Sequence, residues 1–332
     1  NVAVGTDALY FNTTASENTA VGYQAAYSTT TGVSNSALGW RSFYTNTTGI
    51  QNVALGERAL YLNTTGSYNV SVGMDSLYSN TTAANNTAVG YKAGYSNTTG
   101  GTNTALGNSS FFTNTTGYGN SSVGWESLYS NTTGALNTAI GRQSLRANTT
   151  AGNNTAVGYQ AGYSNTTGSP ITVVGYQAGY SNTSGEIQAF GRLASYSNTT
   201  GVANSSFGLS ALYANTTGGY NTALGYNALV SNTTASYNTA VGYQAAYSNT
   251  TGGRLTAFGY QAGYNCTATG TVQNAFFGNE AGLGNTSGTN NTYIGGSSAT
   301  LMTTGSKNTI IGAFNGNQGG LDIRTASNNI VL

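Results

Sequence analysis

The chain has 332 residues, enough for two ordinary domains, but it contains 48 glycines, one proline and only 5% charged residues. This composition is unusual for a mixed globular domain and favours a periodic structure. The few Lys and Arg are scattered among the acids, which argues against a nucleic-acid partner. One cysteine, no histidine and no apolar run of about 20 residues argue against a disulfide framework, zinc sites and insertion into a membrane.

The main feature along the chain is a glycine that returns every 17 residues. It runs from Gly5 to Gly175 at this spacing and continues to Gly312, with one step of 16 residues and one of 19. The series defines nineteen repeats of the form N-T-A-V-G-Y-Q-A-G-Y-S-N-T-T-G-x-x. Each repeat is called a rung here, with positions numbered 1 to 17 from its Asn, and the residues at one position form a column. Such a repeat predicts a solenoid.

Within a rung, the T-A-V segment alternates with period two and contains β-branched residues, which favours a strand. The sequence therefore predicts an all-β, parallel β-solenoid or β-roll. Each rung would hold a strand, a glycine corner, a second short strand and a polar turn. The irregular steps fall near Glu186 and between Cys266 and Val272, in the predicted turn.

The predicted domain organisation has two parts. Residues 1–314 form the repeat array, and residues 315–332 form an exit or cap that leads to a C-terminal region outside this sequence. Because the chain starts within the repeat pattern at Asn1, we expect it to be an excerpt of a longer protein.

Three columns predict which side chains face the core. Column 4 is always apolar, so it is expected to face inward. Column 8 holds only Ala or Ser, which indicates a packed surface, and column 7 holds charges of both signs, which indicates solvent. The predicted core column includes Val4, Val21, Leu38, Leu55, Val72 and Val89. Column 1 is Asn in 16 rungs and predicts an asparagine ladder between rungs.

Column 10 predicts self-assembly because it is aromatic in 14 rungs. A regular aromatic surface of this length favours contact with another copy of the chain, most plausibly in a homotrimer. The alternative is a monomer whose tyrosines stack as an exposed ladder. The predicted assembly seam comprises Tyr10, Tyr27, Tyr44, Tyr61, Tyr78 and Tyr95.

The Asn-Thr-Thr segment at positions 12 to 14 contains N-x-S/T triplets along one edge, which are glycosylation acceptors in secreted proteins. A spacing of about 4.8 Å between rungs would crowd full glycans, so a turn that favours Asn and Thr is the simpler interpretation. The candidate glycosylation sites include Asn12, Asn46, Asn63, Asn80 and Asn97.

No catalytic residues, cofactor or metal ligands are predicted. The acids fall in different rungs, and Arg58 separates the neighbouring pair Glu57 and Asp75 in sequence and neutralises it. The calcium-roll motif G-G-x-G-x-D is also missing. Cys266 replaces the Asn of column 12 and is expected to be an inert turn residue.

The segment N-T-A-V-G-Y-Q-A, at residues 18–25, 154–161 and 238–245, resembles the N-S-x-A-I-G-x-x-A repeat of trimeric autotransporter adhesin heads. The 17-residue unit also resembles arrays of phage tail-fibre-like and bacterial surface proteins. This resemblance implies a parallel β-roll in an extracellular or virion-surface fibre. The chain departs from the adhesin heads in its longer period and in its tyrosine column.

These observations predict a structural or adhesive fibre segment that acts as a rigid spacer and attachment surface. Its expected partners are itself, as a trimer or fibre, and a cell-surface glycan or receptor. One alternative is a solenoid that binds ice or a glycan surface through its threonines, for which Thr13 and Thr14 are the type pair. A polysaccharide-degrading tailspike is a further alternative, but it lacks the carboxylate cluster that such an enzyme needs.

Overall fold

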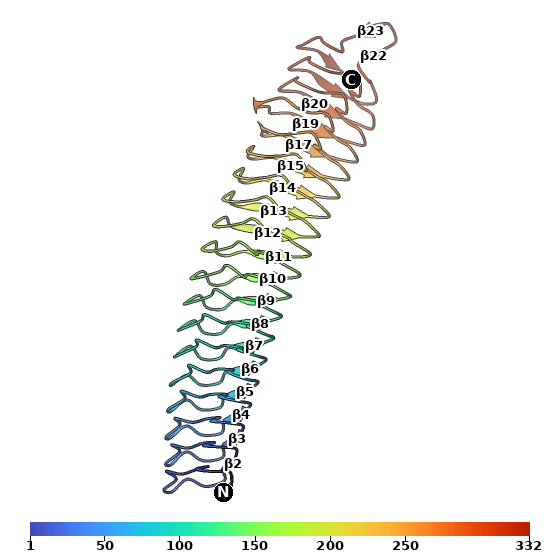
Figure 1. The fold of residues 1–332 in the computed structure, drawn as a ribbon. Coiled ribbons are helices and arrows are strands. Elements are labelled where there is room, and N and C mark those ends of the chain that lie inside the picture. The colour runs from blue at the N-terminus through green and yellow to red at the C-terminus, as the bar shows by residue number, and fades with distance from the viewer. The chain divides into compact units, whose positions relative to one another are not determined.

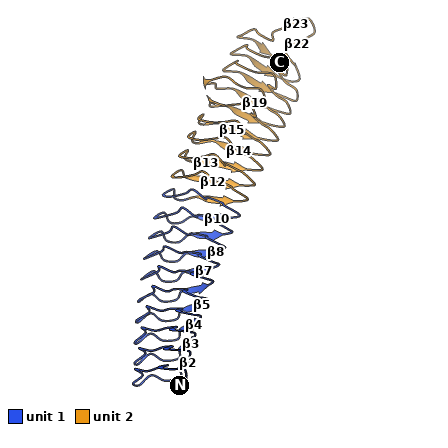
Figure 2. Ribbon diagram, viewed as in Figure 1, with its two compact units in different colours: residues 1–170 blue, residues 171–332 orange.

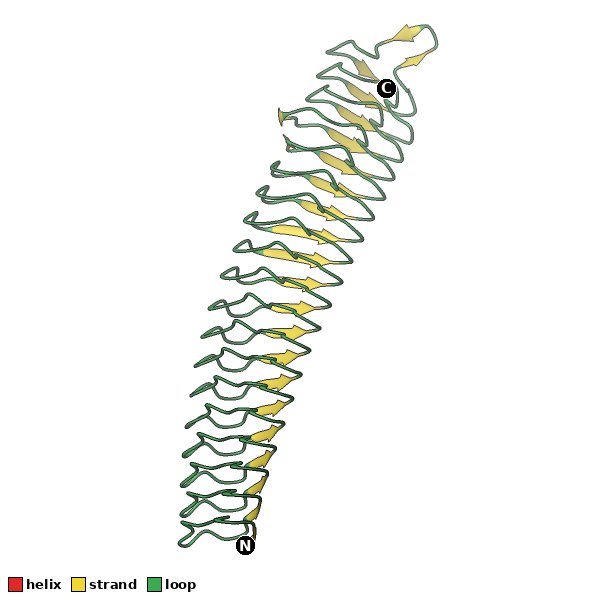
Figure 3. Ribbon diagram, in the orientation of Figure 1, coloured by secondary structure: helices red, strands yellow, loops and turns green.

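The computed structural model describes all 332 residues as a β-solenoid of about nineteen turns, about 17 residues apart, with no helix (Figures 1 and 3). The predicted fold class is therefore confirmed. Strands of two to four residues alternate with bends and turns. The chain divides into two compact units, Asn1–Pro170 and Ile171–Leu332, which are described separately (Figure 2).

In the first unit each strand pairs in parallel with the strand of the next rung. The register joins residues 17 apart, so that Ala20 lies beside Ala37 and Ala37 beside Ala54. The repeat length thus equals one turn of the solenoid. The strands are β1 (Val2–Val4), β2 (Thr19–Val21), β3 (Ser36–Leu38), β4 (Val53–Leu55), β5 (Val70–Val72), β6 (Thr87–Val89), β7 (Thr104–Leu106), β8 (Ser121–Val123), β9 (Thr138–Ile140) and β10 (Thr155–Val157).

The second unit repeats this parallel stacking, and its irregular steps lie outside the main sheet. The longer rung forms a small extra parallel pair, β16 with β18. The strands are β11 (Thr172–Val174), β12 (Ile187–Phe190), β13 (Asn204–Phe207), β14 (Thr222–Leu224), β15 (Thr239–Val241), β16 (Gly252–Gly253), β17 (Thr256–Phe258), β18 (Gly270–Thr271), β19 (Ala275–Phe277), β20 (Thr292–Ile294), β21 (Thr309–Ile311), β22 (Asn317–Gln318), β23 (Leu321–Asp322) and β24 (Ile330–Val331).

The last segment was predicted to leave the array, but the sheet continues into it. After β21 the chain makes an antiparallel hairpin of β22 and β23, and β24 then pairs in parallel with β21. The backbone N–H of Asn329 donates to the side-chain oxygen of Asn308 at 2.9 Å, as column 1 does elsewhere. Asn329 therefore begins a further rung after a step of 21 residues.

The glycine of column 5 turns the chain sharply after each strand of the main array. Gly56 has φ of +132°, and a Cβ added there would lie 2.7 Å from the carbonyl carbon of Gly73 in the next rung. A side chain is therefore opposed both by the backbone conformation and by the neighbouring rung. This double restriction explains why the column contains only glycine.

The segment after this corner is not the second strand that was predicted. Its residues at positions 7 and 9 have positive φ, for example 51° at Arg58 and 52° at Leu60. Backbone N–H groups still reach the adjacent rungs, since Leu60 donates to Ser76 at 3.0 Å and Arg58 to Trp40 at 3.0 Å. Columns 7 and 9 contain no Val, Ile or Thr, the residues that tolerate positive φ least.

The core lies between the strand and this segment, and the predicted core column was wrong. The buried strand residue is at position 3, usually Ala, and it packs with columns 8 and 9, as at Ala54, Ala59 and Leu60. Column 4 points outward. Val4, Leu38 and Val89 are 56%, 50% and 39% exposed, and Val21, Leu55 and Val72 are half-buried. The coil is too narrow for a branched residue at every inward strand position, so small residues face inward.

Two asparagine ladders complete the interior. In column 1, the backbone N–H and the side-chain amide of Asn52 donate to the side-chain oxygen of Asn35 at 2.9 and 3.1 Å, which confirms the predicted ladder. A second ladder in column 12 was not predicted. There the side-chain amide of Asn63 donates to Asn46 at 3.1 Å, and both residues are fully buried. The core of this solenoid is therefore polar along one side.

Candidate functional site

The acids of the chain do not form a catalytic pair. Asp75 is 3% exposed, and its carboxylate lies 2.8 Å from Nε of Arg58, whereas Glu57 lies 3.8 Å from the same nitrogen. The expected neutralisation by Arg58 is therefore confirmed, although Asp75 of column 7 is buried rather than solvated. No three His, Cys, Asp or Glu side chains come together in a group that could hold a metal ion.

The predicted glycosylation sites lie in the core. Asn46, Asn63, Asn80 and Asn97 are no more than 1% exposed, and Asn12 at the first rung is half-buried. The side-chain nitrogen, where a glycan would attach, is occupied in the ladder: that of Asn80 donates to Asn63 at 2.8 Å and to the carbonyl of Ala83 at 3.1 Å. The folded chain has no room for glycans on the four buried residues. For them the prediction was wrong because the triplet encodes an internal ladder.

The threonines that follow these asparagines differ in exposure. The hydroxyl of position 13 donates to the next rung, as Thr64 does to the carbonyl of Thr81 at 3.1 Å. The residue at position 14, such as Thr65, is exposed. Of the Thr-Thr pair, only one column thus remains to contact an external surface. This arrangement does not favour binding of ice through paired threonines.

Cys266 takes the place of an Asn in the column 12 ladder. Its sulfur lies 3.9 Å from the side-chain nitrogens of Asn274 and Asn285. The thiol is buried, and burial raises its pKa, which leaves it protonated and unreactive at neutral pH. It lies in the core rather than in a surface turn.

The tyrosines of column 10 form the most regular surface of the first unit. Consecutive rings from Tyr10 to Tyr129 lie 5.1 to 5.4 Å apart and within 12° of parallel. Each ring covers its neighbours, so Tyr27, Tyr44, Tyr61, Tyr78 and Tyr95 are half-buried, while Tyr10 at the first rung is 61% exposed. The stacking arises within a single chain. The role of this column as an assembly seam stays a prediction.

Column 6 forms a second aromatic surface beside the first, with column 7 between them. Arg41 at position 7 lies 4.7 Å from the Trp40 ring of column 6 and 5.5 Å from the Tyr44 ring of column 10. In the second unit, Tyr226, Tyr243 and Tyr260 of column 6 stack at 5.2 and 5.3 Å. Sugars and other ring-shaped ligands bind aromatic surfaces of this kind, so these columns are the candidate attachment surface.

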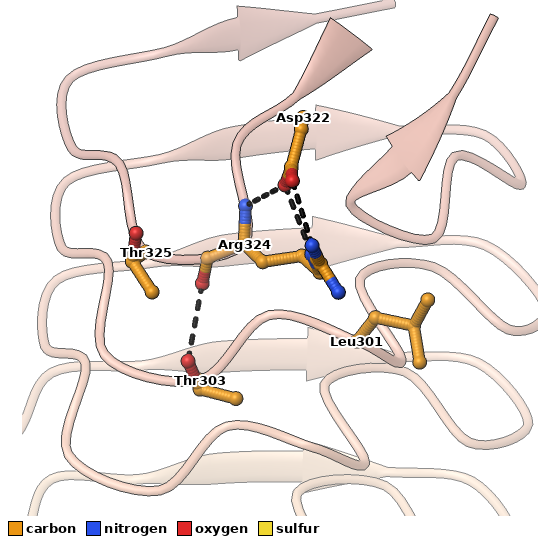
Figure 4. A pocket seen from close by; sticks show the side chains of 5 residues that line it. All are labelled: Leu301, Thr303, Asp322, Arg324 and Thr325. Atoms are coloured by element: carbon orange, nitrogen blue, oxygen red, sulfur yellow. Dashed lines mark hydrogen bonds and ion pairs between the residues drawn. The ribbon is translucent and has the colours of Figure 1, made fainter. Parts of the chain in front are cut away.

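A cavity of about 520 Å³ lies near the end of the second unit, lined by Leu301, Thr303, Asp322, Arg324 and Thr325 (Figure 4). Its charges satisfy each other. Arg324 donates to both carboxylate oxygens of Asp322, at 3.0 and 2.7 Å, and this contact holds the pKa of Asp322 below its usual value. The Thr303 hydroxyl donates to the carbonyl of Arg324 at 3.3 Å. No charged group is left over to recognise a ligand.

No protein-family model, curated protein or solved structure matches this chain. The structure also contains no helix with the length and apolar character needed to cross a membrane.

Proposed function

We propose that the chain is a structural segment of an extracellular or virion-surface fibre, a stiff spacer that also offers an attachment surface, and not an enzyme. One observation carries this proposal. Rung after rung repeats the same internal contacts, a parallel strand pair and two asparagine ladders, so each unit resists bending while the same outer columns recur along its side. Repeated shallow columns suit adhesion better than catalysis, which needs a unique enclosed site.

Self-association, as a trimer, belongs to the same proposal. The exposed column 4 offers aliphatic side chains such as Leu38, 50% exposed, at every rung, and a second copy of the chain has the matching period. Column 10 is the other candidate seam, but its rings already cover one another. The structure thus supports the outer face of the strands, rather than the tyrosines, as the first place to look for an interface.

Small-angle X-ray scattering with equilibrium sedimentation tests this proposal on the intact chain. We expect the scattering of a long, thin particle and a mass that is a multiple of the 33.8 kDa chain. A compact, globular profile would contradict the spacer function. A thin monomer at micromolar concentration would contradict self-association alone.

A further inference from the structure

One rung of the first unit interrupts both aromatic columns with arginine. Arg142 occupies column 6, with its guanidinium 4.4 Å from the Trp125 ring and 5.8 Å from the Tyr159 ring. In the same rung Arg146 occupies column 10, 5.1 Å from the ring of Tyr129. No other rung carries an arginine in both columns. The chain therefore places two cations at one level of an otherwise almost uncharged surface.

The two arginines differ in how they are neutralised. Nε of Arg146 donates to Oε2 of Glu126 at 2.8 Å, and Nε2 of Gln143 donates to the same oxygen at 3.0 Å. Arg142 makes no ion pair and no side-chain hydrogen bond, only the contacts with aromatic rings. Its side chain is exposed. This level of the solenoid thus has one carboxylate, two guanidinium groups and one uncompensated positive charge.

A hollow of about 320 Å³ opens beside Trp125 and Arg142. That volume is at the lower end of the range for small-molecule sites and suits a group of one or two rings. Trp125 is 38% exposed at its edge. The remaining oxygen of Glu126, Oε1, receives no hydrogen bond from the chain, so it can accept one from a ligand. A cation, an aromatic edge and a free acceptor therefore lie together.

We propose that this hollow binds a sugar acid, that is, a saccharide ring that carries a carboxylate. The carboxylate pairs with Arg142, the C–H groups of the ring pack on Trp125, and a ring hydroxyl donates to Oε1 of Glu126. The ligand carries one negative charge because only one guanidinium is uncompensated. A phosphate dianion fits less well beside the carboxylate of Glu126, and a nucleic acid would need several further cations. This inference deepens the attachment role proposed above and rests on it.

Fluorescence titration tests the site, because the chain has only two tryptophans. In a Trp40→Phe background the signal comes from Trp125 alone. The probes are sialyllactose, a trigalacturonic acid and, as the neutral control, lactose. We expect saturable binding of at least one acid and none of lactose. The acid that binds more tightly distinguishes a terminal sialic acid from a uronic acid within a polysaccharide.

Arg142→Gln should weaken binding about tenfold or more, since it removes a charge-assisted pair. The matched control is Arg192→Gln, because Arg192 also occupies column 6 beside a tyrosine ring, at 5.8 Å, but has no tryptophan near it. That variant should bind as the parent does. Circular dichroism checks that each variant stays folded.

Failure to bind either acid, equal binding of lactose, or undiminished binding by Arg142→Gln would each overturn the site. Scattering measured on the same samples separates this outcome from failure of the spacer function. A long, thin particle that binds no sugar acid loses only the site, whereas a compact particle would contradict the spacer whatever it binds.

Discussion

The side-chain amide of Asn63 donates both to the side-chain oxygen of Asn46, at 3.1 Å, and to the carbonyl of Gly66, at 2.9 Å. In turn, its own side-chain oxygen accepts from Asn80 at 2.8 Å. Replacement by alanine would leave buried polar groups without partners on both sides. We expect Asn63→Ala to lower the free energy of unfolding by about 1–3 kcal/mol, measured by guanidinium denaturation. Thr65→Ala, in an exposed position of the same turn, should change it little.

The glycine corner is expected to be the least tolerant position. Gly56→Ala would place a methyl group 2.7 Å from the carbonyl carbon of Gly73 at a positive φ, so the rung spacing would have to open. We expect loss of soluble, folded protein or a large drop in the melting temperature. Gly296→Ala is the control, since an added Cβ there meets nothing within 4 Å. Equal stability of the two variants would contradict the close-packed corner.

Columns 3 and 9 share one volume, which a double substitution can test. In most rungs a small residue at position 3 faces a larger one at position 9, but Phe276 faces Gly282, whose added Cβ would lie 2.9 Å from the Phe276 ring. Phe276→Ala should cost about 3–5 kcal/mol through the cavity that it leaves. Gly282→Leu alone should overpack the rung. The double variant recreates the pairing of Ala54 with Leu60, so we expect it to be more stable than either single variant by thermal denaturation.

Acid should weaken the contact of Glu126 with Arg146. Partial burial pushes the pKa of Glu126 upward, but hydrogen bonds from Arg146 and Gln143 outweigh it and lower the pKa overall. A lowered folded-state pKa stabilises the protein above the unfolded-state value of about 4.3, and this contribution is lost as the pH falls through the folded-state pKa. The stability difference between the parent and Glu126→Gln, from denaturation curves between pH 7 and about pH 3, should therefore shrink on the acid side. A constant difference would contradict the assignment.

Two triple variants should distinguish the candidate assembly seams. If the strand face is the interface, replacement of Leu38, Leu55 and Val72 by threonine will reduce the sedimenting mass to that of one chain while the fold persists. Replacement of Tyr61, Tyr78 and Tyr95 by serine would then lower stability, through the lost ring stacking, without changing the mass. The reverse result would assign the seam to the tyrosines.

The repeat length predicted the parallel register, because a column must meet itself one turn later. It did not predict which strand face is buried, since alternation in T-A-V fits either choice. The informative signal was size: column 3 is mostly Ala, whereas column 4 varies from Val to Phe, as at Val21 and Phe258. An outward column tolerates such variation, and a narrow interior does not.

The positive φ values could also have been anticipated, from the missing β-branched residues in columns 7 and 9. The candidate sugar site could not. Arg142 and Arg146 look like isolated charges in sequence, and only the rung spacing places Trp125 and Glu126 beside them. A site assembled across rungs needs the register before its members can be grouped.

The asparagine ladders also bear on how such a gene changes. Within each unit their contacts reach only to the adjacent rung, as from Asn35 to Asn18 and Asn52. Loss or duplication of one whole repeat therefore leaves every surviving residue with an equivalent neighbour. Recombination between near-identical copies would alter the length of the array in heritable steps of one rung, while a one-residue frame error in the strand would break both ladders. Length is thus the property that selection can adjust most freely in this chain.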